Sequence, residues 1–201
     1  IGVAAAWNRG MKVALDNNLD YIMIINTDIL LHKDCIDNLV NFYQSSPTLA
    51  IVMATDVSRK IGIAHHAAAV KSFDEYSRDL DSIAWPETGG AGFSCFLTGP
   101  ELIKNVGWFD ENFIGAYYED NDMHWRLVQA GYGSQATYDA LYVHFESRSI
   151  KEGGYHNGNF SKNFQYFKKK HKTESVDIIN SPYYKNPKGI KNKYNGEIYE
   201  A

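Results

Sequence analysis

The feature that most constrains the fold is a continuous apolar run at residues 21–25. A strand without polar alternation is typical of a sheet whose two faces are both covered. Residues 3–15 place apolar side chains at helical spacing, and residues 49–54 form a second apolar run after a helix that Asp34 can cap. The resulting order of helix, strand, helix and strand predicts an α/β fold, with a mixed, mainly parallel sheet flanked by helices.

The rest of the chain continues this alternation less regularly. Its 201 residues, 44% hydrophobic and 22% charged, are typical of a soluble globular protein with one sizeable core. We expect one domain over residues 1–150 and a basic helix and tail over residues 151–201. The further expected elements are a strand at 62–70, an irregular charged segment at 71–86, a glycine-rich turn at 89–92, a strand at 93–97, a helix from Pro100 to Gly107, a helix at 120–130, a strand at 134–145, an amphipathic helix at 160–171 and a loop-like end.

The charge of the chain is unevenly distributed. The whole chain carries a net charge of −4, whereas residues 151–201 hold ten lysines against five acidic residues, which leaves −9 on residues 1–150. A basic tail favours anions such as phosphates or a lipid surface, although Lys168–Lys170 could equally be the solvated end of a helix. No apolar stretch reaches a membrane-spanning length, and we expect no signal peptide. Cys35 and Cys95 are expected to be small core residues in a reducing compartment.

The first candidate site is Asn26-Thr27-Asp28, directly after the apolar run. In open α/β sheets ligands bind beyond the carboxyl ends of the strands, so Asp28 should point into such a crevice. A carboxylate there suits Mg²⁺ or Mn²⁺, which retain water and take further ligands from substrate phosphates. The alternative is that Asp28 caps a turn before Asp34.

The second candidate site is the acidic cluster Glu119-Asp120-Asn121-Asp122, preceded by Tyr117-Tyr118. One or two carboxylates at a helix start are ordinary, because the helix dipole stabilises them. Three in four residues exceed what capping needs, and clustered carboxylates raise one another's pKa, which favours a general base. The neighbouring tyrosines are a surface on which a sugar could stack, whereas Trp125 is expected in the core.

The third candidate is His144, which follows an apolar run at residues 140–143. A lone histidine at a strand end is more often structural, and we interpret His65-His66 in that way. With Asp28 and the acidic cluster, however, His144 could complete a site in which a metal neutralises a leaving diphosphate while a carboxylate deprotonates the attacker.

Two groups of motifs resemble the two halves of family-2 glycosyltransferases with the GT-A fold. The likeness covers roughly residues 1–148 and is most specific in the Phe-Asp-Glu and Glu-Asp-x-Asp stretches. The family normally has further strands before the position of Ile1, so we expect that the usual first strands are lacking. The residues that carry the resemblance are Gly2 to Ala6, Asn8, Gly10 and Asn26-Thr27-Asp28 for the nucleotide-sugar half, and Gly89-Gly90, Gly99, Gly107 to Glu111, Tyr118 to Asp122, Arg126, Leu127, Gly131-Tyr132 and His144 for the acceptor half.

The resemblance implies a role for each matching position. Asp28 and His144 would bind Mn²⁺ or Mg²⁺, and Asp120 would be the catalytic base. Glu119 and Asp122 would position the acceptor or tune that base. The residues implied near the donor are Asn8, Gly10, Asn26, Asp28, Gly89 and Gly90.

The implied function is that of an inverting hexosyl- or deoxyhexosyltransferase of polysaccharide biosynthesis. Its partners would be a nucleotide-sugar donor and a glycan or lipid-linked saccharide acceptor, with no nucleic acid. The implied location is cytoplasmic, with peripheral contact to the inner face of a membrane as a further expectation. The alternatives are a catalytically inactive GT-A-like domain that binds nucleotide or glycan, and a nucleotidyltransferase, which would usually need a phosphate-binding loop that we do not find.

Overall fold

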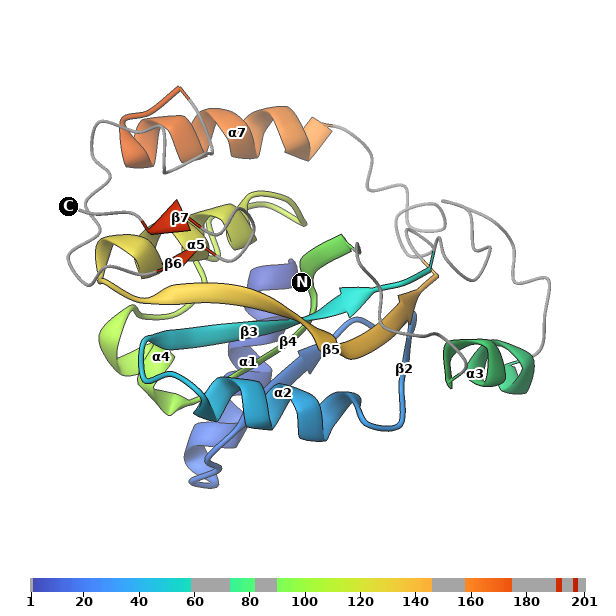
Figure 1. Ribbon diagram of the computed structural model, residues 1–201. Coiled ribbons are helices and arrows are strands. Elements are labelled where there is room, and N and C mark those ends of the chain that lie inside the picture. The colour runs from blue at the N-terminus through green and yellow to red at the C-terminus, as the bar shows by residue number, and fades with distance from the viewer. Residues whose placement is uncertain are drawn as a thin grey trace.

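The computed structural model describes residues 2–58, 73–81, 90–145, 158–174, 191–192 and 197–198. Its centre is a five-stranded sheet with the strand order β1-β4-β3-β5-β2 (Figure 1). The strands of this sheet are β1 Ile22–Ile25, β2 Ile29–Leu31, β3 Leu49–Asp56, β4 Gly90–Thr98 and β5 Gly133–His144. The helices are α1 Val3–Asp16, α2 Cys35–Gln44, α3 Phe73–Asp81, α4 Pro100–Asn105, α5 Glu119–Gln129 and α7 Gly158–His171, and a separate pair is formed by β6 Lys191–Asn192 and β7 Glu197–Ile198.

The sheet is mixed, but the prediction that it is mainly parallel is wrong. Only β3 and β5 pair in parallel, whereas the pairs β1–β4, β3–β4 and β2–β5 are antiparallel. The reason lies in β4, which begins with Gly90 opposite Asp56, the last residue of β3, and therefore runs back along that strand. Strands β1, β3 and β5 nevertheless share one direction, so their carboxyl ends lie at one edge of the sheet.

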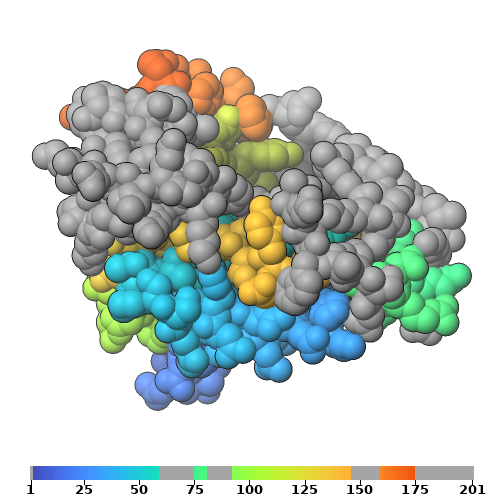
Figure 2. Space-filling model, in the orientation of Figure 1, coloured from blue at the N-terminus to red at the C-terminus, as the bar shows by residue number. Residues whose placement is uncertain are grey.

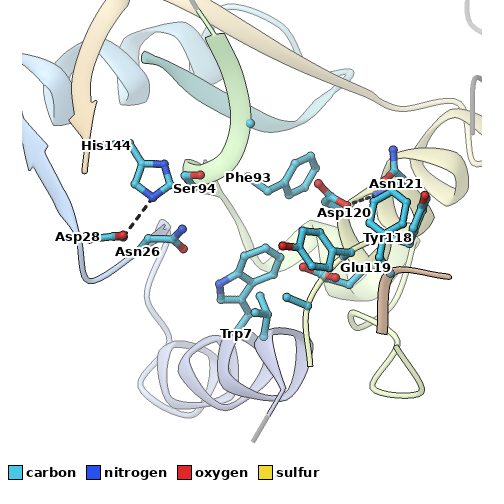
Figure 3. A pocket seen from close by; sticks show the side chains of 15 residues that line it. Trp7, Asn26, Asp28, Phe93, Ser94, Tyr118, Glu119, Asp120, Asn121 and His144 are labelled. Atoms are coloured by element: carbon cyan, nitrogen blue, oxygen red, sulfur yellow. Dashed lines mark hydrogen bonds and ion pairs between the residues drawn. The ribbon is translucent and has the colours of Figure 1, made fainter. Parts of the chain in front are cut away.

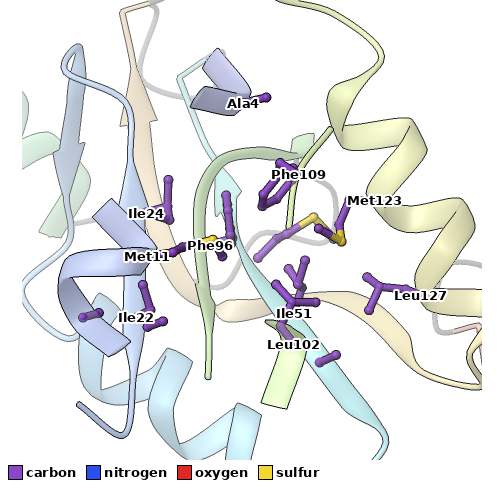
Figure 4. Close-up of a cluster of buried hydrophobic side chains, with 13 residues drawn as sticks. Ala4, Met11, Ile22, Ile24, Ile51, Phe96, Leu102, Phe109, Met123 and Leu127 are labelled. Atoms are coloured by element: carbon purple, nitrogen blue, oxygen red, sulfur yellow. The ribbon is translucent and has the colours of Figure 1, made fainter. Parts of the chain in front are cut away.

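Helices cover both faces of this sheet, as the apolar runs predict. Alternate residues of β3 point to opposite sides, because side chains alternate along a strand. Ile51 and Met53 pack with helices α1, α4 and α5, whereas Val52 and Ala54 pack with α2. Figure 4 shows the first cluster, whose labelled members are Ala4, Met11, Ile22, Ile24, Ile51, Phe96, Leu102, Phe109, Met123 and Leu127.

Most predicted elements are confirmed within a few residues, with two exceptions. The segment 71–86 contains helix α3, because Tyr76 and Leu80, one turn apart, bury apolar side chains against Leu141 and Val143 of β5. The predicted glycine-rich turn is wrong for residues 90–92, which begin β4. Gly89 and the strand predicted at 62–70 lie outside the described residues, as does most of the chain end.

Helix α7 packs on the outer side of α5, away from the sheet (Figure 1). Phe167 is fully buried with Trp125, which confirms the prediction that Trp125 is a core residue. Figure 2 shows the start of α7 at the surface beside the segment that leads into α5. Among the described residues, no helix combines the length and the apolar character needed to cross a bilayer.

Candidate active site

A cavity of about 620 Å³ lies at the carboxyl ends of β1 and β5, beside the start of α5 (Figure 3). It brings together Asp28, His144, Glu119 and Asp120, which come from three separate parts of the sequence. The cavity is lined by Val3, Trp7, Asn26, Asp28, Gly92, Phe93, Ser94, Ala116, Tyr117, Tyr118, Glu119, Asp120, Asn121, His144 and Phe160. The structure therefore brings residues of all three candidate sites to one cavity, with Asp122 as an exception.

Asp28 and His144 form a pair at one end of the cavity. Strand β2 pairs with the end of β5, so Ile29 lies opposite His144 and the Phe145 N–H donates to the Asp28 carbonyl at 2.9 Å. The His144 Nε2 atom lies 3.1 Å from Asp28 Oδ1. The Ser58 hydroxyl accepts a bond from the His144 N–H at 2.7 Å, which fixes the backbone of this histidine.

Asp28 and His144 form a hydrogen bond, and a carboxylate beside an imidazole is also a donor set that can bind a divalent metal. Within the described residues, no group of three or more His, Cys, Asp or Glu side chains could hold a metal ion. Mg²⁺ commonly uses only one or two protein ligands and takes the rest from water and phosphate oxygens. The residues present therefore fit Mg²⁺ or Mn²⁺.

The other residues predicted near a donor are divided between the cavity and the rest of the structure. Asn26 lines the cavity, and its N–H donates to the Ser94 carbonyl at 2.9 Å. Gly90 pairs with Asp56 inside the sheet, whereas Gly92 faces open space where a side chain would otherwise project into the cavity. Gly10 is exposed on α1 and is not among the lining residues.

Asn8 connects two parts of the fold through side-chain hydrogen bonds. Its Oδ1 accepts from the Phe109 N–H at 3.0 Å, and its Nδ2 donates to the Phe109 carbonyl and to Glu111 Oε1, each at 2.8 Å. These bonds join α1 to the segment before α5, and Asn8 is not among the residues that line the cavity. The predicted donor contact of Asn8 is not supported by this geometry.

Glu119 and Asp120 form the second charged part of the cavity. Glu119 is 6% exposed, and its Oε2 has no hydrogen-bond partner among the described residues. Burial and the neighbouring charge of Asp120 raise the pKa of Glu119 to about 7. The Asp120 carboxylate accepts from the Asn121 N–H at 2.8 Å, and desolvation of this carboxylate raises its pKa. A carboxylate with a raised pKa is suited to accept a proton near neutral pH.

Asp122, the third predicted member of the acidic cluster, lies on another face of α5 and does not line the cavity. Its side chain is fully buried against α7, where it contacts Arg126 Nε at 2.9 Å, His171 Nε2 at 2.8 Å and Lys170 Nζ at 2.6 Å. Burial alone would raise the pKa of Asp122, but the bond from His171 and the charges of Arg126 and Lys170 outweigh it and lower the pKa. Asp122 therefore joins two helices.

The segment before α5 has an unusual backbone conformation at the cavity wall. Tyr117 and Tyr118 have φ values of 85° and 72°, a region that residues other than glycine rarely adopt. Asn163 of α7, 1% exposed, fixes this segment: its side chain accepts from the Ile114 N–H at 3.0 Å and donates to the carbonyls of Ile114, Ala116 and Tyr117 at 3.0–3.1 Å. Strained residues of this kind concentrate at functional sites.

Four aromatic or hydroxyl-bearing side chains that line the cavity were absent from the sequence-based prediction of the site. Trp7 and Phe93 form one aromatic group with ring centroids 6.4 Å apart, Ser94 lies on β4, and Phe160 lies on α7. The signal for Phe160 was its membership of an amphipathic helix, which does not show what that helix contacts. The signal for Ser94 and Phe93 was their place at the start of a strand that follows glycines.

The structure is that of an α/β protein whose cavity contains a paired carboxylate and imidazole. Comparison with known proteins finds similarity to proteins of one enzyme class, the glycosyltransferases. The chain is 41% identical over 66 residues to a galactofuranosyl glycosyltransferase of Leishmania donovani, a match that covers 32% of this chain and 15% of that protein. It is 25% identical over 154 residues to a pre-mycofactocin glycosyltransferase of Mycobacterium tuberculosis, with 75% of this chain and 32% of that protein covered.

The chain spans a third or less of the length of these curated relatives. No family model matches the sequence. A solved structure, A197 from STIV, is similar with a TM-score of 0.43 at 12% identity, over 72% of this chain and 68% of that one, which is too distant to define the fold. The sequence similarity is therefore to parts of two proteins that are named glycosyltransferases.

Proposed function

We propose that this chain is the catalytic part of an inverting, metal-dependent glycosyltransferase of the GT-A type and family 2. It would transfer a hexosyl or deoxyhexosyl group from a nucleoside-diphosphate sugar to a hydroxyl of a glycan or lipid-linked saccharide. The observation that carries this proposal is the single cavity that holds Asp28 and His144 on one side and Glu119 and Asp120 on the other (Figure 3). The similarity to two proteins named glycosyltransferases supports the same class.

The donor side of the cavity is assigned to Asp28, His144 and Asn26. Asp28 and His144 would hold Mn²⁺ or Mg²⁺, which supplies positive charge next to the oxygens of the departing diphosphate. Asn26 offers an amide that can donate to a ribose or phosphate oxygen. Gly92 leaves space for the sugar because no atom lies within 4 Å of where its Cβ would be.

The acceptor side is assigned to Asp120 and Glu119. In the proposed step the acceptor oxygen forms a bond to the anomeric carbon while the bond from that carbon to the diphosphate oxygen breaks. The proton of the acceptor hydroxyl passes to Asp120, and the electron pair of the broken bond leaves with the nucleoside diphosphate. Glu119 lines the cavity next to Asp120 and would position the acceptor or tune that base.

Release of nucleoside diphosphate from a panel of UDP-, GDP- and dTDP-sugars, with Mn²⁺ and with EDTA, tests this assignment. Asp120→Asn should lower turnover by about 10²- to 10⁴-fold, the range typical of a lost general base. Asp28→Ala should lower turnover and raise the Mn²⁺ concentration that is needed. Asp16→Asn is the matched control, because Asp16 is exposed, does not line the cavity and forms an ion pair with Lys12 on the surface of α1.

If Asp28→Ala and Asp120→Asn both turn over at the wild-type rate, these two residues do not have the proposed roles. Binding of a nucleotide sugar without any release of nucleoside diphosphate would instead favour an inactive binding domain. Release of pyrophosphate from a nucleoside triphosphate and a sugar phosphate would favour a nucleotidyltransferase.

A further inference from the structure

Two half-exposed aromatic side chains form a wall of the cavity next to the proposed base. Tyr117 is 37% exposed and Phe160 is 47% exposed, and both line the cavity with Glu119 and Asp120. Their ring centroids are 5.4 Å apart with an interplanar angle of 71°. The two rings come from different elements, the segment before α5 and the start of α7, so the wall exists only where these elements meet.

This wall is held rigidly from behind. Tyr118, 9% exposed, packs on Phe160 at 4.9 Å between ring centroids and stacks on Phe164 at 5.3 Å. Asn163, one turn along α7 from Phe160, bonds to the backbone of Tyr117. Aromatic rings that are fixed at the back and open to a cavity at the front are pre-organised for stacking on a ligand, because little conformational freedom remains to be lost on binding.

The charges beside the wall restrict the chemistry of that ligand. Glu119 and Asp120 disfavour a phosphate or another anion at this end of the cavity. The diphosphate of a donor is better placed near Asp28 and His144 at the other end. An uncharged ring with C–H groups on one face and hydroxyls on its edge fits both the aromatic rings and the carboxylates, and a sugar has this character.

We propose that Tyr117 and Phe160 form the subsite for the acceptor, in which a neutral sugar ring stacks and presents its hydroxyl to Asp120. This inference rests on the proposed function and extends it to helix α7, which lies beyond the region of sequence resemblance. It also names the class of acceptor group in contact with the protein, which is a neutral saccharide.

Phe160→Leu provides the test, since leucine keeps an apolar side chain but removes the ring. The Michaelis constants for donor and acceptor are measured on the full chain with a panel of methyl glycosides of neutral hexoses as acceptors. Loss of one aromatic stacking partner should raise the acceptor KM by about 3- to 10-fold, with the donor KM changed less than twofold. Tyr138→Leu is the matched control, because Tyr138 is 44% exposed on β5 and does not line the cavity, so neither constant should change.

Phe160→Trp gives a second readout that does not require turnover. A tryptophan at this position restores the stacking surface, and its fluorescence should respond to at least one of the neutral methyl glycosides. An acceptor KM that Phe160→Leu leaves unchanged, an equal rise of both constants, or no fluorescence response to any glycoside would overturn the inference. If wild-type protein instead releases no nucleoside diphosphate from any donor while the fluorescence response is present, the proposed reaction fails and the sugar subsite stands.

Discussion

The substitution Asn163→Asp is expected both to destabilise the protein and to disturb the cavity wall at Tyr117. The Asn163 amide carries two hydrogens, and these serve three backbone carbonyls, of Ile114, Ala116 and Tyr117. Aspartate retains the oxygen that accepts from the Ile114 N–H at 3.0 Å, but it replaces the two donor hydrogens with a second oxygen that faces three carbonyl oxygens. The variant is therefore nearly identical in shape and opposite in hydrogen-bonding character.

The magnitude follows from the number of bonds lost and from burial. Two lost hydrogen bonds are worth about 2 kcal/mol, and a buried carboxylate without a donor adds at least about 1–3 kcal/mol. We expect the free energy of unfolding at pH 7 to fall by about 3–5 kcal/mol. The folded protein would raise the pKa of the new carboxyl group, so this loss should be smallest below the unfolded pKa near 4 and should grow as the pH rises through the folded pKa.

Urea denaturation followed by circular dichroism at pH 4.5 and pH 7.5 measures this effect, and hydrogen exchange of the Ile114 amide reports on the segment itself. Asn17→Asp is the control, because Asn17 also donates to a backbone carbonyl, that of Val13 at 2.8 Å, but is exposed. It should cost less than about 1 kcal/mol. If Asn163→Asp changes stability no more than this control, and the exchange of the Ile114 amide stays the same, then Asn163 does not hold the segment as argued.

Three further predictions concern buried ionisable groups. Asp122→Asn should lower the free energy of unfolding at pH 7 by about 3–5 kcal/mol, because it removes a fully buried carboxylate that pairs with Arg126, Lys170 and His171. Since the folded state lowers the pKa of Asp122, this contribution is present above the unfolded pKa and lost as the pH falls, so urea denaturation of the variant should show a weaker dependence on acid pH than wild type. Glu119→Gln should raise the free energy of unfolding at pH 8.5 by up to about 3 kcal/mol, because folding raises the pKa of Glu119 from 4.5 to about 7 and the ionised carboxylate therefore destabilises the folded state. This gain in stability should vanish below pH 4.5. An equal difference between variant and wild type at both pH values would contradict the reasoning. Cys35 and Cys95 are both free and buried, and a hydrogen bond with Cys35 together with burial raises the pKa of Cys95. Ellman's reagent should therefore react with both thiols only after urea is added, and rapid reaction of the native protein would refute this.

The positions of the helices and strands could be predicted from the sequence because apolar periodicity is a local signal. The run at residues 21–25 and the stripe at residues 3–15 became β1 and α1 with ends shifted by a residue. The direction of the strands could not be predicted, because it depends on which residues of β3 and β4 pair, and that pairing joins segments far apart in the chain. Gly90 lies opposite Asp56, so β4 runs antiparallel to β3.

Asp28 and His144 lie together although the sheet is not mainly parallel, and the reason is geometric. The prediction required only that the strands before Asp28 and His144 end at the same edge of the sheet. Strands β1 and β5 are both parallel in direction to β3, since β1 is antiparallel to β4 and β4 is antiparallel to β3. Strand β2 then pairs back on β5 and places Asp28 beside His144. A mixed sheet with this order therefore gives the same convergence as a parallel one.

The acidic cluster was interpreted too broadly, and helix geometry explains why. Successive residues of an α-helix are rotated by about 100°, so residues 120 and 122 lie about 200° apart around α5. Asp120 and Asp122 cannot both face one cavity. A local signal for the structural place of Asp122 was available in its i,i+4 spacing to Arg126, which forms the ion pair at 2.9 Å. Its bond to His171, 49 residues later, had no such signal.

The two halves of the site thus differ in what holds them. Asp28 and His144 are positioned by backbone pairing within the sheet, which the strand pattern partly encodes. Tyr117 and its neighbours adopt an unfavourable backbone conformation, and it is Asn163 of α7 that stabilises it through tertiary bonds. The sequence of α7 shows only an amphipathic helix with aromatic residues at helical spacing, and that pattern does not distinguish Phe167, which is buried, from Phe160, which faces the cavity. Side chains whose role depends on the neighbour they meet are therefore the ones that a single sequence cannot assign, and in this protein they lie on the acceptor side.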